Sequence, residues 1–361
     1  MPAETPIQRV LIYRLGSLGD MVVALPCLHL IGRQYPGAER RLLTNFPVNA
    51  KAPAAAAVLG ESGLVSGYLR YTAGTRSVRE LLRVVREVRR FKPDVLVFLM
   101  DLRPWKLVQR DLLFFRLCGV KGVVGAPSEQ AMERGYDAST GMWEAESHRL
   151  ARLIGELGDA RLEDRASWDL RLANAERQTA SEALGQVRGK RLIVCGPGTK
   201  MQAKDWGKER WRELLGMLAR RYPDAGLALV GAAEDAEVSE FAAQEWAGAR
   251  VNLCGKLTPR ETAAVLEHAA VFLGPDSGPM HLAASVGVPC VIAFSSRGQK
   301  GVWYPAGTQH EVIYRGPECM ACELETCLVE QRKCLTSISV DEMEQAVVRV
   351  MGRPNLKSNH G

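Results

Sequence analysis

The sequence predicts an α/β fold with two doubly wound parallel sheets, each forming its own domain. Two successive series of short β-branched apolar runs alternate with longer amphipathic runs, and a charged, poorly patterned stretch at 159–189 separates them. The chain has 361 residues, whereas a single hydrophobic core seldom grows beyond about 250–300 residues. We therefore expect two Rossmann-like domains, at 1–175 and 188–350, that face a central cleft, followed by a disordered tail at 352–361.

The first series is read from β-branched and apolar runs of strand length. The expected strands are 10–15, 41–44, 65–69, 94–100 and 122–125. Residues 78–91 place valines and leucines on one face and Arg79, Arg83, Arg86 and Arg90 on the other. This pattern predicts an amphipathic helix with a basic outer face.

The second series begins at Arg191. Its expected strands are 192–195, 227–230, 251–253, 271–273 and 290–294. Thr258, Pro259 and Glu261 form the signature of a helix start, a capping box with proline at the first helical position. Strands that alternate with helices in this way predict a parallel sheet.

Composition narrows the class of protein. No apolar run approaches the ~18 residues that a membrane span requires, and residues 1–8 lack the pattern of a secretory signal, so we expect a cytoplasmic protein. The formal charge of +6 favours anionic partners such as nucleotide diphosphates, phosphorylated glycolipids or nucleic acid, without choosing among them.

The first motif of chemical interest is Gly16-Ser17-Leu18-Gly19-Asp20, between the first strand and a helical run at 21–35. Ligands bind at such strand ends in open parallel sheets. The glycine spacing is not that of dinucleotide-binding enzymes, which argues against a nicotinamide site. Asp20 is either a catalytic carboxylate or simply a helix N-cap.

A second motif follows the first strand of the second series. Gly198 and Thr199 precede Lys204, so a glycine-rich turn is followed by a cation. Glycines let the backbone approach a phosphate closely, and a lysine supplies a point charge for it. The alternative is a plain turn with a solvated lysine.

The third motif, Asp276-Ser277-Gly278-Pro279-Met280-His281, runs from a strand into a helix of small residues. Pro279 suits the first helical position, so the neighbouring N–H groups would form an anion site at the helix N-terminus. A turn capped by Asp276 would not account for His281, although a single histidine usually has a structural role. Glu234 follows another strand and is either a ribose contact or an ordinary first-turn acid.

Four cysteines, Cys319, Cys322, Cys327 and Cys334, cluster in a short polar segment. Four thiolates would complete a tetrahedral structural zinc site. The spacing matches no standard zinc finger, so plain reduced thiols remain the alternative.

Five segments, in chain order, resemble glycosyltransferase family 9, the ADP-heptose:lipopolysaccharide heptosyltransferases and their relatives. They are GSLGD, PGT with KDW, LVGAAED, NLCGKLTPRETAAVLEHA and DSGPMHLAASVGVP. The resemblance covers nearly the whole chain. It implies the GT-B fold, with the donor held mainly by the second domain, and transfer that inverts the anomeric centre without a catalytic metal or other cofactor.

The resemblance also implies roles for individual residues. Asp20 would be the general base, Lys204 the diphosphate partner and Glu234 the nucleoside contact, while Asp276, Ser277, Gly278 and His281 would form the donor-phosphate loop. Inverting transfer requires a base for the acceptor hydroxyl and positive groups for the departing diphosphate, and these residue types supply both.

The predicted activity is transfer of a sugar, with heptose from ADP-heptose the leading choice, onto a lipopolysaccharide-core or related lipid-linked saccharide. A nucleotide-sugar 2-epimerase and a non-catalytic binding protein are the alternatives; a nucleic-acid partner is not expected. The arginine face at 78–91 and the basic, apolar run at 105–115 suggest peripheral contact with the anionic inner-membrane leaflet. Taken alone, an arginine face is usually just solvated, and Phe114 and Phe115 are more often core residues.

Three departures from the family pattern lie near the expected donor site. Gly207 stands where proline usually follows the tryptophan, and Pro275 precedes Asp276 where asparagine is common. Phe294-Ser295-Ser296-Arg297 replaces the usual Phe-Gly loop. These changes bear on which sugar the donor carries.

Overall fold

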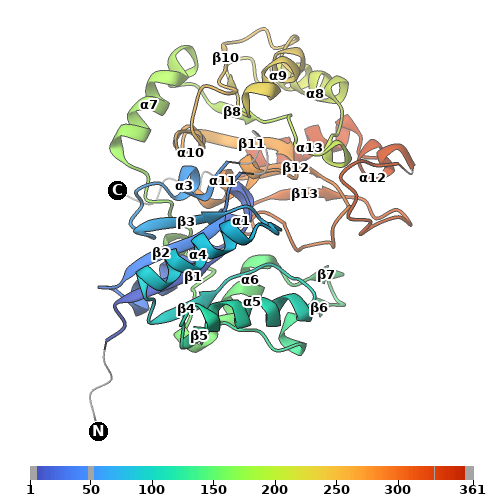
Figure 1. The fold of residues 1–361 in the computed structure, drawn as a ribbon. Coiled ribbons are helices and arrows are strands. Elements are labelled where there is room, and N and C mark those ends of the chain that lie inside the picture. The colour runs from blue at the N-terminus through green and yellow to red at the C-terminus, as the bar shows by residue number, and fades with distance from the viewer. Residues whose placement is uncertain (1–5, 48–52, 329, 354–361) are drawn as a thin grey trace. The chain divides into compact units, whose positions relative to one another are not determined.

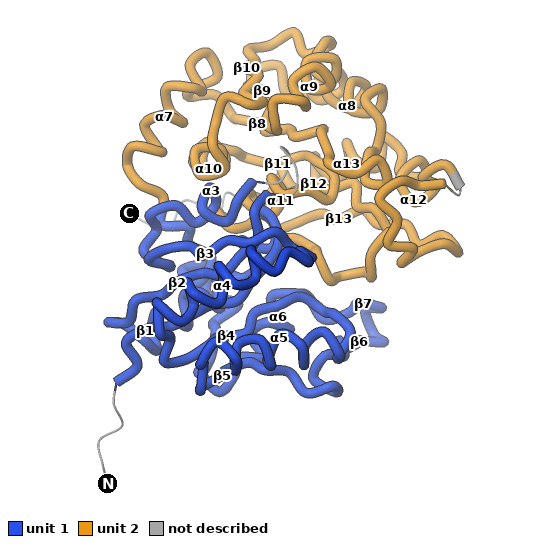
Figure 2. The backbone as a smooth tube through the Cα atoms, viewed as in Figure 1, with its two compact units in different colours: residues 1–171 blue, residues 172–361 orange. Residues whose placement is uncertain are grey.

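The computed structural model describes residues 6–47, 53–328 and 330–353. The chain divides into two compact units, Met1–Arg171 and Leu172–Gly361 (Figure 2). Each unit is built around one parallel sheet flanked by helices (Figure 1).

The sheet of unit 1 has the strand order β3-β2-β1-β4-β5, and all its pairs are parallel. Its strands are β1 (Arg9–Tyr13), β2 (Glu39–Asn45), β3 (Gly67–Tyr71), β4 (Val95–Phe98) and β5 (Gly122–Val124). The chain moves outward from β1 in one direction to β3 and then resumes at β4 on the other side of β1. This reversal creates a switch point between β1 and β4, where ligands bind in doubly wound sheets.

The helices of unit 1 are α1 (Leu18–Val23), α2 (Leu25–Gln34), α3 (Ala55–Leu59), α4 (Val78–Phe91), α5 (Trp105–Leu117) and α6 (Glu146–Leu153). The predicted helix at 78–91 is confirmed residue for residue. The helical run expected at 21–35 is instead two helices that meet at Ala24. Pro26 lies in the first turn of α2, and proline, which has no N–H to donate, is tolerated there but not in a helix interior.

The sheet of unit 2 has the order β10-β9-β8-β11-β12-β13, again with parallel pairs throughout. Its strands are β8 (Leu192–Cys195), β9 (Gly226–Leu229), β10 (Arg250–Asn252), β11 (Ala269–Pro275), β12 (Cys290–Phe294) and β13 (Glu311–Tyr314). The predicted strands 192–195 and 290–294 are confirmed exactly. The edge strand β13 was not predicted.

The main helices of unit 2 are α7 (Asn174–Leu184), α8 (Lys208–Arg221), α9 (Ala236–Ala242), α10 (Pro259–Leu266), α11 (Gly278–Ser285), α12 (Lys333–Thr336) and α13 (Val340–Gly352). The capping box that starts α10 is confirmed, because Thr258 accepts from the Glu261 N–H and Pro259 is the first helical residue. The tail was predicted to begin at residue 352, but Gly352 is the last residue of α13. Residues 354–361 lie outside the described residues.

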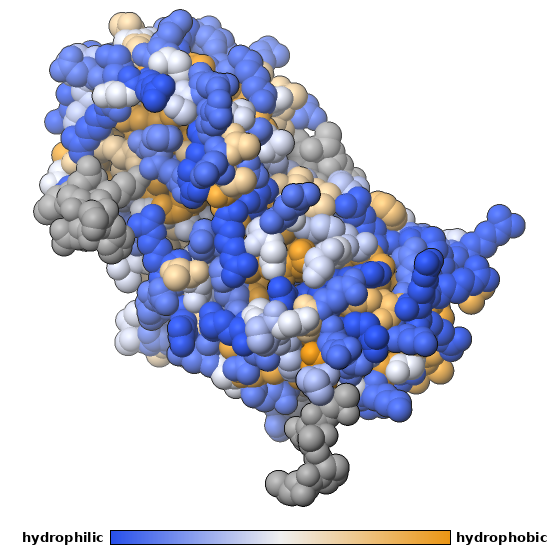
Figure 3. Space-filling model, turned by 90° about the vertical axis from the view of Figure 1, so that its left-hand side faces the viewer, coloured by the Kyte–Doolittle hydropathy of each residue, from blue (hydrophilic) through white to orange (hydrophobic). Residues whose placement is uncertain are grey.

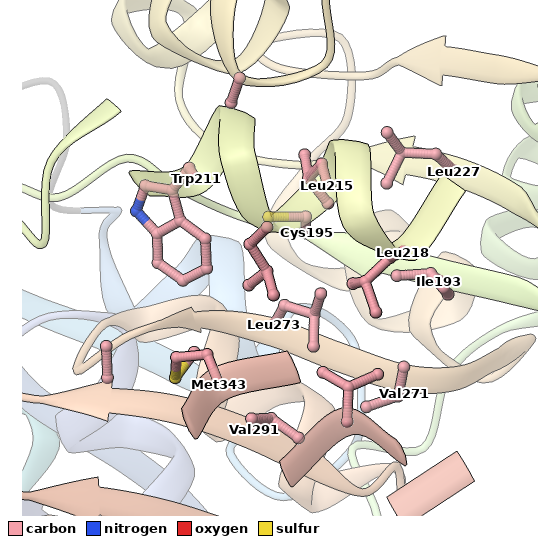
Figure 4. Packing of buried hydrophobic residues seen from close by; sticks show 14 of the residues in the cluster. Ile193, Cys195, Trp211, Leu215, Leu218, Leu227, Val271, Leu273, Val291 and Met343 are labelled. Atoms are coloured by element: carbon pink, nitrogen blue, oxygen red, sulfur yellow. The ribbon is translucent and has the colours of Figure 1, made fainter. Parts of the chain in front are cut away.

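The core of unit 2 fills the space between its sheet and the helices α8 and α13 (Figure 4). Ile193, Leu215, Leu273 and Met343 are all fully buried there. The central strands β8 and β11 are buried along nearly their whole length, which explains their continuous apolar sequence.

The surface of the molecule contrasts with these cores. On the face shown in Figure 3, hydrophilic residues predominate and hydrophobic ones appear only as small areas between them. Among the described residues, no helix is both long and apolar enough to cross a membrane.

Candidate functional site

The candidate residues of unit 2 gather at the switch point of its sheet. The neighbouring strands β8 and β11 lie at this point, since the chain continues from β8 to β9 on one side and from β11 to β12 on the other. Gly198 and Thr199 follow β8, whereas Asp276 and Ser277 follow β11. Two motifs that are distant in the sequence therefore end beside each other.

An ion pair joins these two motifs. Lys204 Nζ lies 2.8 Å from Asp276 Oδ2. The Lys204 side chain is 19% exposed and that of Asp276 only 8%. Partial burial strengthens the attraction and holds the ammonium group beside the loop that leads into α11.

The N-terminus of α11 offers hydrogen-bond donors at the same place. Ser277 is the N-cap, Gly278 the first helical residue, and Pro279 lies within the first turn, one position later than predicted. The buried Ser277 Oγ has no hydrogen-bond partner in the described part of the chain. The first N–H groups of a helix lack intrahelical partners, so this hydroxyl and these amides can bind an anion.

His281 lies one turn into α11 and is buried. Burial lowers the pKa of His281 to about 4, although the nearby Asp276 opposes this shift. The ring is therefore neutral at physiological pH. It packs edge-to-face against Trp303, with ring centroids 6.2 Å apart.

The predicted ribose contact, Glu234, is exposed, whereas its neighbour Asp235 is buried. The Asp235 carboxylate accepts from the Ala232 N–H at 2.9 Å. A Cβ added to Gly198 would lie 2.2 Å from Asp235 Cγ. Gly198 is thus needed for this close approach, a packing role that its sequence pattern did not reveal.

In unit 1, Asp20 lies after β1 at the corresponding switch point. Asp20 is not the N-cap; Ser17 is, and Asp20 is the third residue of α1. Its Oδ2 accepts from the Ser17 N–H at 2.8 Å. A Cβ on Gly16, whose φ is +130°, would fall 2.3 Å from Asp20 Cγ, so glycine is required there. Gly19 is inside the first turn of α1.

Arg14, at the end of β1, orients Asp20 from the other side. Arg14 Nη2 lies 3.7 Å from Asp20 Oδ1, and the Arg14 side chain is 1% exposed, against 26% for Asp20. The Ser17 amide therefore holds the Asp20 carboxylate by a hydrogen bond, and the Arg14 guanidinium forms a longer ion pair with it, while part of the carboxylate stays accessible. Asp20 lies after the strand as its motif predicted, whereas no sequence pattern indicated Arg14.

Arg14 belongs to a buried charge network that no sequence motif indicated. Glu146, at the start of α6, lies 3.2 Å from Arg14, 2.7 Å from Arg149 and 2.6 Å from Arg134. Arg14 and Arg149 also donate to the carbonyls of Leu99 and Met100, just after β4. The network thus ties α6 to the strand ends that flank Asp20.

Glu146 carries the only negative charge among these four side chains. Burial alone would raise the pKa of Glu146, but the hydrogen bond from Arg149 and the charges of Arg14, Arg149 and Arg134 lower it to about 2. Glu146 is therefore ionised at neutral pH, and its charge offsets the cost of burying Arg14 and Arg149.

The cysteine segment contacts the turn that carries Lys204. The Ala203 N–H donates to the Glu325 carbonyl at 3.0 Å. Arg332 Nη1 donates to both the carbonyl and the carboxylate of Asp205 at 2.8 Å. These bonds flank Lys204 on both sides, so the cysteine segment supports the turn.

The four thiols themselves are half-buried, except Cys322, which is exposed. Burial raises the pKa of Cys319, and the other three thiols raise it further. Within residues 6–47, 53–328 and 330–353, no three or more His, Cys, Asp or Glu side chains form a group that could hold a metal ion.

The departures from the family pattern also lie beside Lys204. Gly207 has φ +108°, a conformation closed to proline, whose φ is fixed near −65°. Ser295 Oγ donates to the Ala203 carbonyl at 2.9 Å. Both departures therefore alter how the Lys204 turn is held.

We expect the pH dependence of stability to reveal the Glu146 network. Glu146→Gln should lower the free energy of unfolding at pH 7 by about 3–5 kcal/mol, the usual cost of breaking a buried ion pair. Because the folded-state pKa is depressed from 4.5 to about 2, the ionised carboxylate stabilises the fold above pH 4.5. That contribution is lost as the pH falls towards 2, so wild type and variant should converge.

Urea unfolding from pH 7 to pH 3, followed by tryptophan fluorescence, would measure this difference. Glu144→Gln is the matched control, since Glu144 pairs with the half-exposed Arg152 and should cost at most about 1 kcal/mol. Equal losses in the two variants, or a gap that does not change with pH, would contradict the assignment.

Comparisons with known proteins show the family and the fold of this chain. The model of glycosyltransferase family 9 (heptosyltransferase) matches residues 148–333. Lipopolysaccharide heptosyltransferase 3 of Escherichia coli K12 is 22% identical over 295 residues, 77% of this chain and 80% of that protein.

Solved structures share the fold across nearly the whole chain. The glycosyltransferase family 9 protein from Veillonella parvula DSM 2008 matches with a TM-score of 0.74 at 18% identity, covering 96% of this chain and 98% of its own. E. coli heptosyltransferase WaaC with ADP-2-deoxy-2-fluoro heptose matches with a TM-score of 0.61 at 18% identity, covering 95% and 99%. The predicted GT-B fold is thereby confirmed, and the chain belongs to glycosyltransferase family 9, the heptosyltransferases.

Proposed function

We propose that this glycosyltransferase transfers heptose from ADP-heptose to a lipopolysaccharide-core or related lipid-linked saccharide, with inversion and without a catalytic metal. The observation that carries the proposal is the Lys204–Asp276 pair at the N-terminus of α11. It places a cation and unpaired helix donors together, as a departing diphosphate requires. The similarity to a lipopolysaccharide heptosyltransferase and to a structure with an ADP-heptose analogue supports this donor and acceptor class.

In the proposed reaction, the acceptor hydroxyl attacks the anomeric carbon while the bond from that carbon to the diphosphate oxygen breaks. Asp20 takes the hydroxyl proton as the new glycosidic bond forms. ADP leaves with the bonding electron pair, and its added charge is stabilised by Lys204, by Ser277 and by the first amides of α11. Such a site acts through fixed charges and dipoles that are in place before the reaction.

Two alternatives use the same fold. A nucleotide-sugar 2-epimerase would consume the donor without an acceptor, and a binding protein would not consume it at all. The partly exposed Asp20, which is held by both Ser17 and Arg14, favours transfer, because a base fixed in this way suits deprotonation of a second substrate. We place the reaction at the cytoplasmic face of the inner membrane, where a lipid-linked acceptor is reached from the cytosol.

Asp20→Asn tests the base. Asparagine can still accept from the Ser17 N–H, so fold and ADP affinity should persist, while turnover falls by about 10²–10⁴-fold, the usual contribution of general base catalysis. ADP release with the glycolipid acceptor and calorimetric ADP binding would be measured in parallel.

Glu261→Gln is the control for Asp20→Asn, since Glu261 is the third residue of α10 and makes the same capping contact away from the site. Near-normal turnover in Asp20→Asn would reduce Asp20 to a helix-capping residue. Donor consumption that does not depend on acceptor would instead favour the epimerase.

Lys204→Ala tests the diphosphate site. Loss of this cation should slow transfer about 10²–10³-fold, equivalent to about 2.7–4 kcal/mol for one preorganised donor to a developing anion. ADP binding should weaken as well, because the same charge faces the product. Lys200→Ala, at an exposed position four residues earlier, should leave both unchanged; unaffected kinetics in Lys204→Ala would exclude the role.

A structural zinc ion in the cysteine segment is a separate proposal. Cys319, Cys322, Cys327 and Cys334 would close around one ion as thiolates, and the bound ion would stiffen the segment that supports the Lys204 turn. Elemental analysis for zinc and iron, both of which four-thiolate sites bind, should find about one equivalent in protein purified without chelator.

Chelation should lower the melting temperature before it lowers the activity of the protein that remains folded. Cys322→Ser should reduce the metal content in the same way. Metal-free protein with unchanged stability would leave the four residues as plain thiols.

A further inference from the structure

Large apolar side chains are exposed on two helices of unit 1. Twelve such residues are exposed in the described part of the chain, and six of them lie on α4 and α5. Val78, Leu113 and Leu117 are 67%, 56% and 64% exposed. The complete set is Val78, Leu81, Leu82, Leu107, Leu113 and Leu117.

The exposed charges on the same helices all have one sign. Seven exposed residues are basic and none is acidic: Arg79, Arg86, Arg89, Arg90, Lys106, Arg110 and Arg116. The acidic residues turn away from this surface or pair locally. Glu87 forms an ion pair with Arg83 at 2.8 Å. The buried Asp111 forms ion pairs with Arg103 at 2.7 Å and with Arg110, one of the seven, at 2.8 Å.

These side chains lie on two helices that neighbour each other in unit 1. The inner faces of α4 and α5 pack through Val88 and Phe115 into the same core, which also contains Leu11 and Phe98 of the sheet. Arg89 Nη2 donates to the Leu117 carbonyl at 2.8 Å and joins the two helices directly. Figure 1 shows both helices on the same side of the β1–β4 strands. We call their exposed residues the α4–α5 surface.

The residues of this region that are exposed to a partner differ from those that the sequence predicted. Phe115 belongs to the core, with 1% exposure, so the apolar part of the predicted membrane-facing run 105–115 is Leu107 and Leu113, extended by Leu117. Arg83, expected on the basic face, is engaged with Glu87 and the Arg70 carbonyl. Arg89, which the arginine pattern did not include, is exposed.

We propose that the α4–α5 surface binds an anionic lipid bilayer at its interface, with the basic groups at the headgroups and the leucines below them. Interfacial elements combine basic and large apolar side chains in this way. Each Lys or Arg near an anionic membrane contributes about 1 kcal/mol of attraction, which salt screens, whereas apolar insertion is insensitive to salt.

The arrangement fits a lipid surface better than a protein partner. The buried core of a protein interface is depleted of charged residues. Here basic residues adjoin the exposed apolar ones along the chain, as at Val78-Arg79, Lys106-Leu107 and Arg116-Leu117. A bilayer interface accommodates both because long basic side chains reach the headgroups while apolar groups enter the acyl boundary.

Vesicle flotation of the full chain tests the proposal. Wild type should bind vesicles that contain phosphatidylglycerol and bind pure phosphatidylcholine weakly. The triple variant Arg79→Gln, Arg86→Gln, Arg90→Gln should bind the anionic vesicles about 100-fold more weakly at low salt, as three lost charges of about 1 kcal/mol each imply. The variant Leu82→Ser, Leu113→Ser, Leu117→Ser should lose the binding that survives high salt.

A control with the same charge change uses exposed residues of unit 2, Arg188→Gln, Lys190→Gln and Arg220→Gln, and should bind like wild type. Circular dichroism verifies the fold of each variant. Equal binding by wild type and the arginine variant, or an equal loss in the control, overturns the proposal. So does self-association that the leucine variant abolishes while vesicle binding persists, because the surface would then be a protein interface.

Vesicle binding needs neither donor nor acceptor, so this inference stands apart from the proposed reaction. Transfer to a soluble, delipidated acceptor should be unchanged in both α4–α5 variants. Loss of that soluble activity in a folded variant would place these helices in the catalytic machinery and contradict their assignment as a lipid-binding surface.

Discussion

The ion pair between Lys204 and Asp276 is the interaction on which the candidate donor site depends. The two residues come from loops after adjacent strands, so their meeting requires the reversal of strand order between β8 and β11. Ser295 and the cysteine segment hold the Lys204 turn from one side, and β11 places Asp276 from the other. The sheet topology therefore fixes the position of the Lys204 ammonium, although the lysine side chain is flexible by itself. Electrostatic preorganisation requires a charge that is fixed in this way.

The same local arrangement of a carboxylate and a glycine occurs in both units, with a different role in each. In each, a carboxylate at the third position of a helical turn folds back over a glycine and accepts a backbone N–H: Asp20 over Gly16, and Asp235 over Gly198. Asp235 is buried and has a structural role, whereas 26% of the Asp20 side chain is exposed. Exposure, and the guanidinium of Arg14 beside it, distinguish the candidate base from the structural copy.

The sequence correctly predicted those helices and strands whose apolar residues recur with a regular period. Strands such as 192–195 and the helix 78–91 appear where their apolar patterns placed them, since burial on one face or both leaves a local signature. The helix α7 was missed because only Ala180 and Leu184 are buried in it. Glu146 was missed for another reason: its partner Arg14 lies 132 residues away, and a buried ion pair leaves no pattern in either segment.

The departures from the family pattern bear on the sugar more than on the diphosphate. Gly207 and Ser295 alter the supports of the Lys204 turn, while Lys204, Asp276 and the helix start at Ser277 keep their expected types and meet as the proposal requires. Diphosphate binding depends on charge at that point. Sugar selection depends on the shape of the loops around it, because each hydroxyl must find a partner or remain desolvated and unpaired. The residues that support the Lys204 turn have changed, while the charged residues are retained. The diphosphate can therefore leave in the same way while the preference among sugars differs.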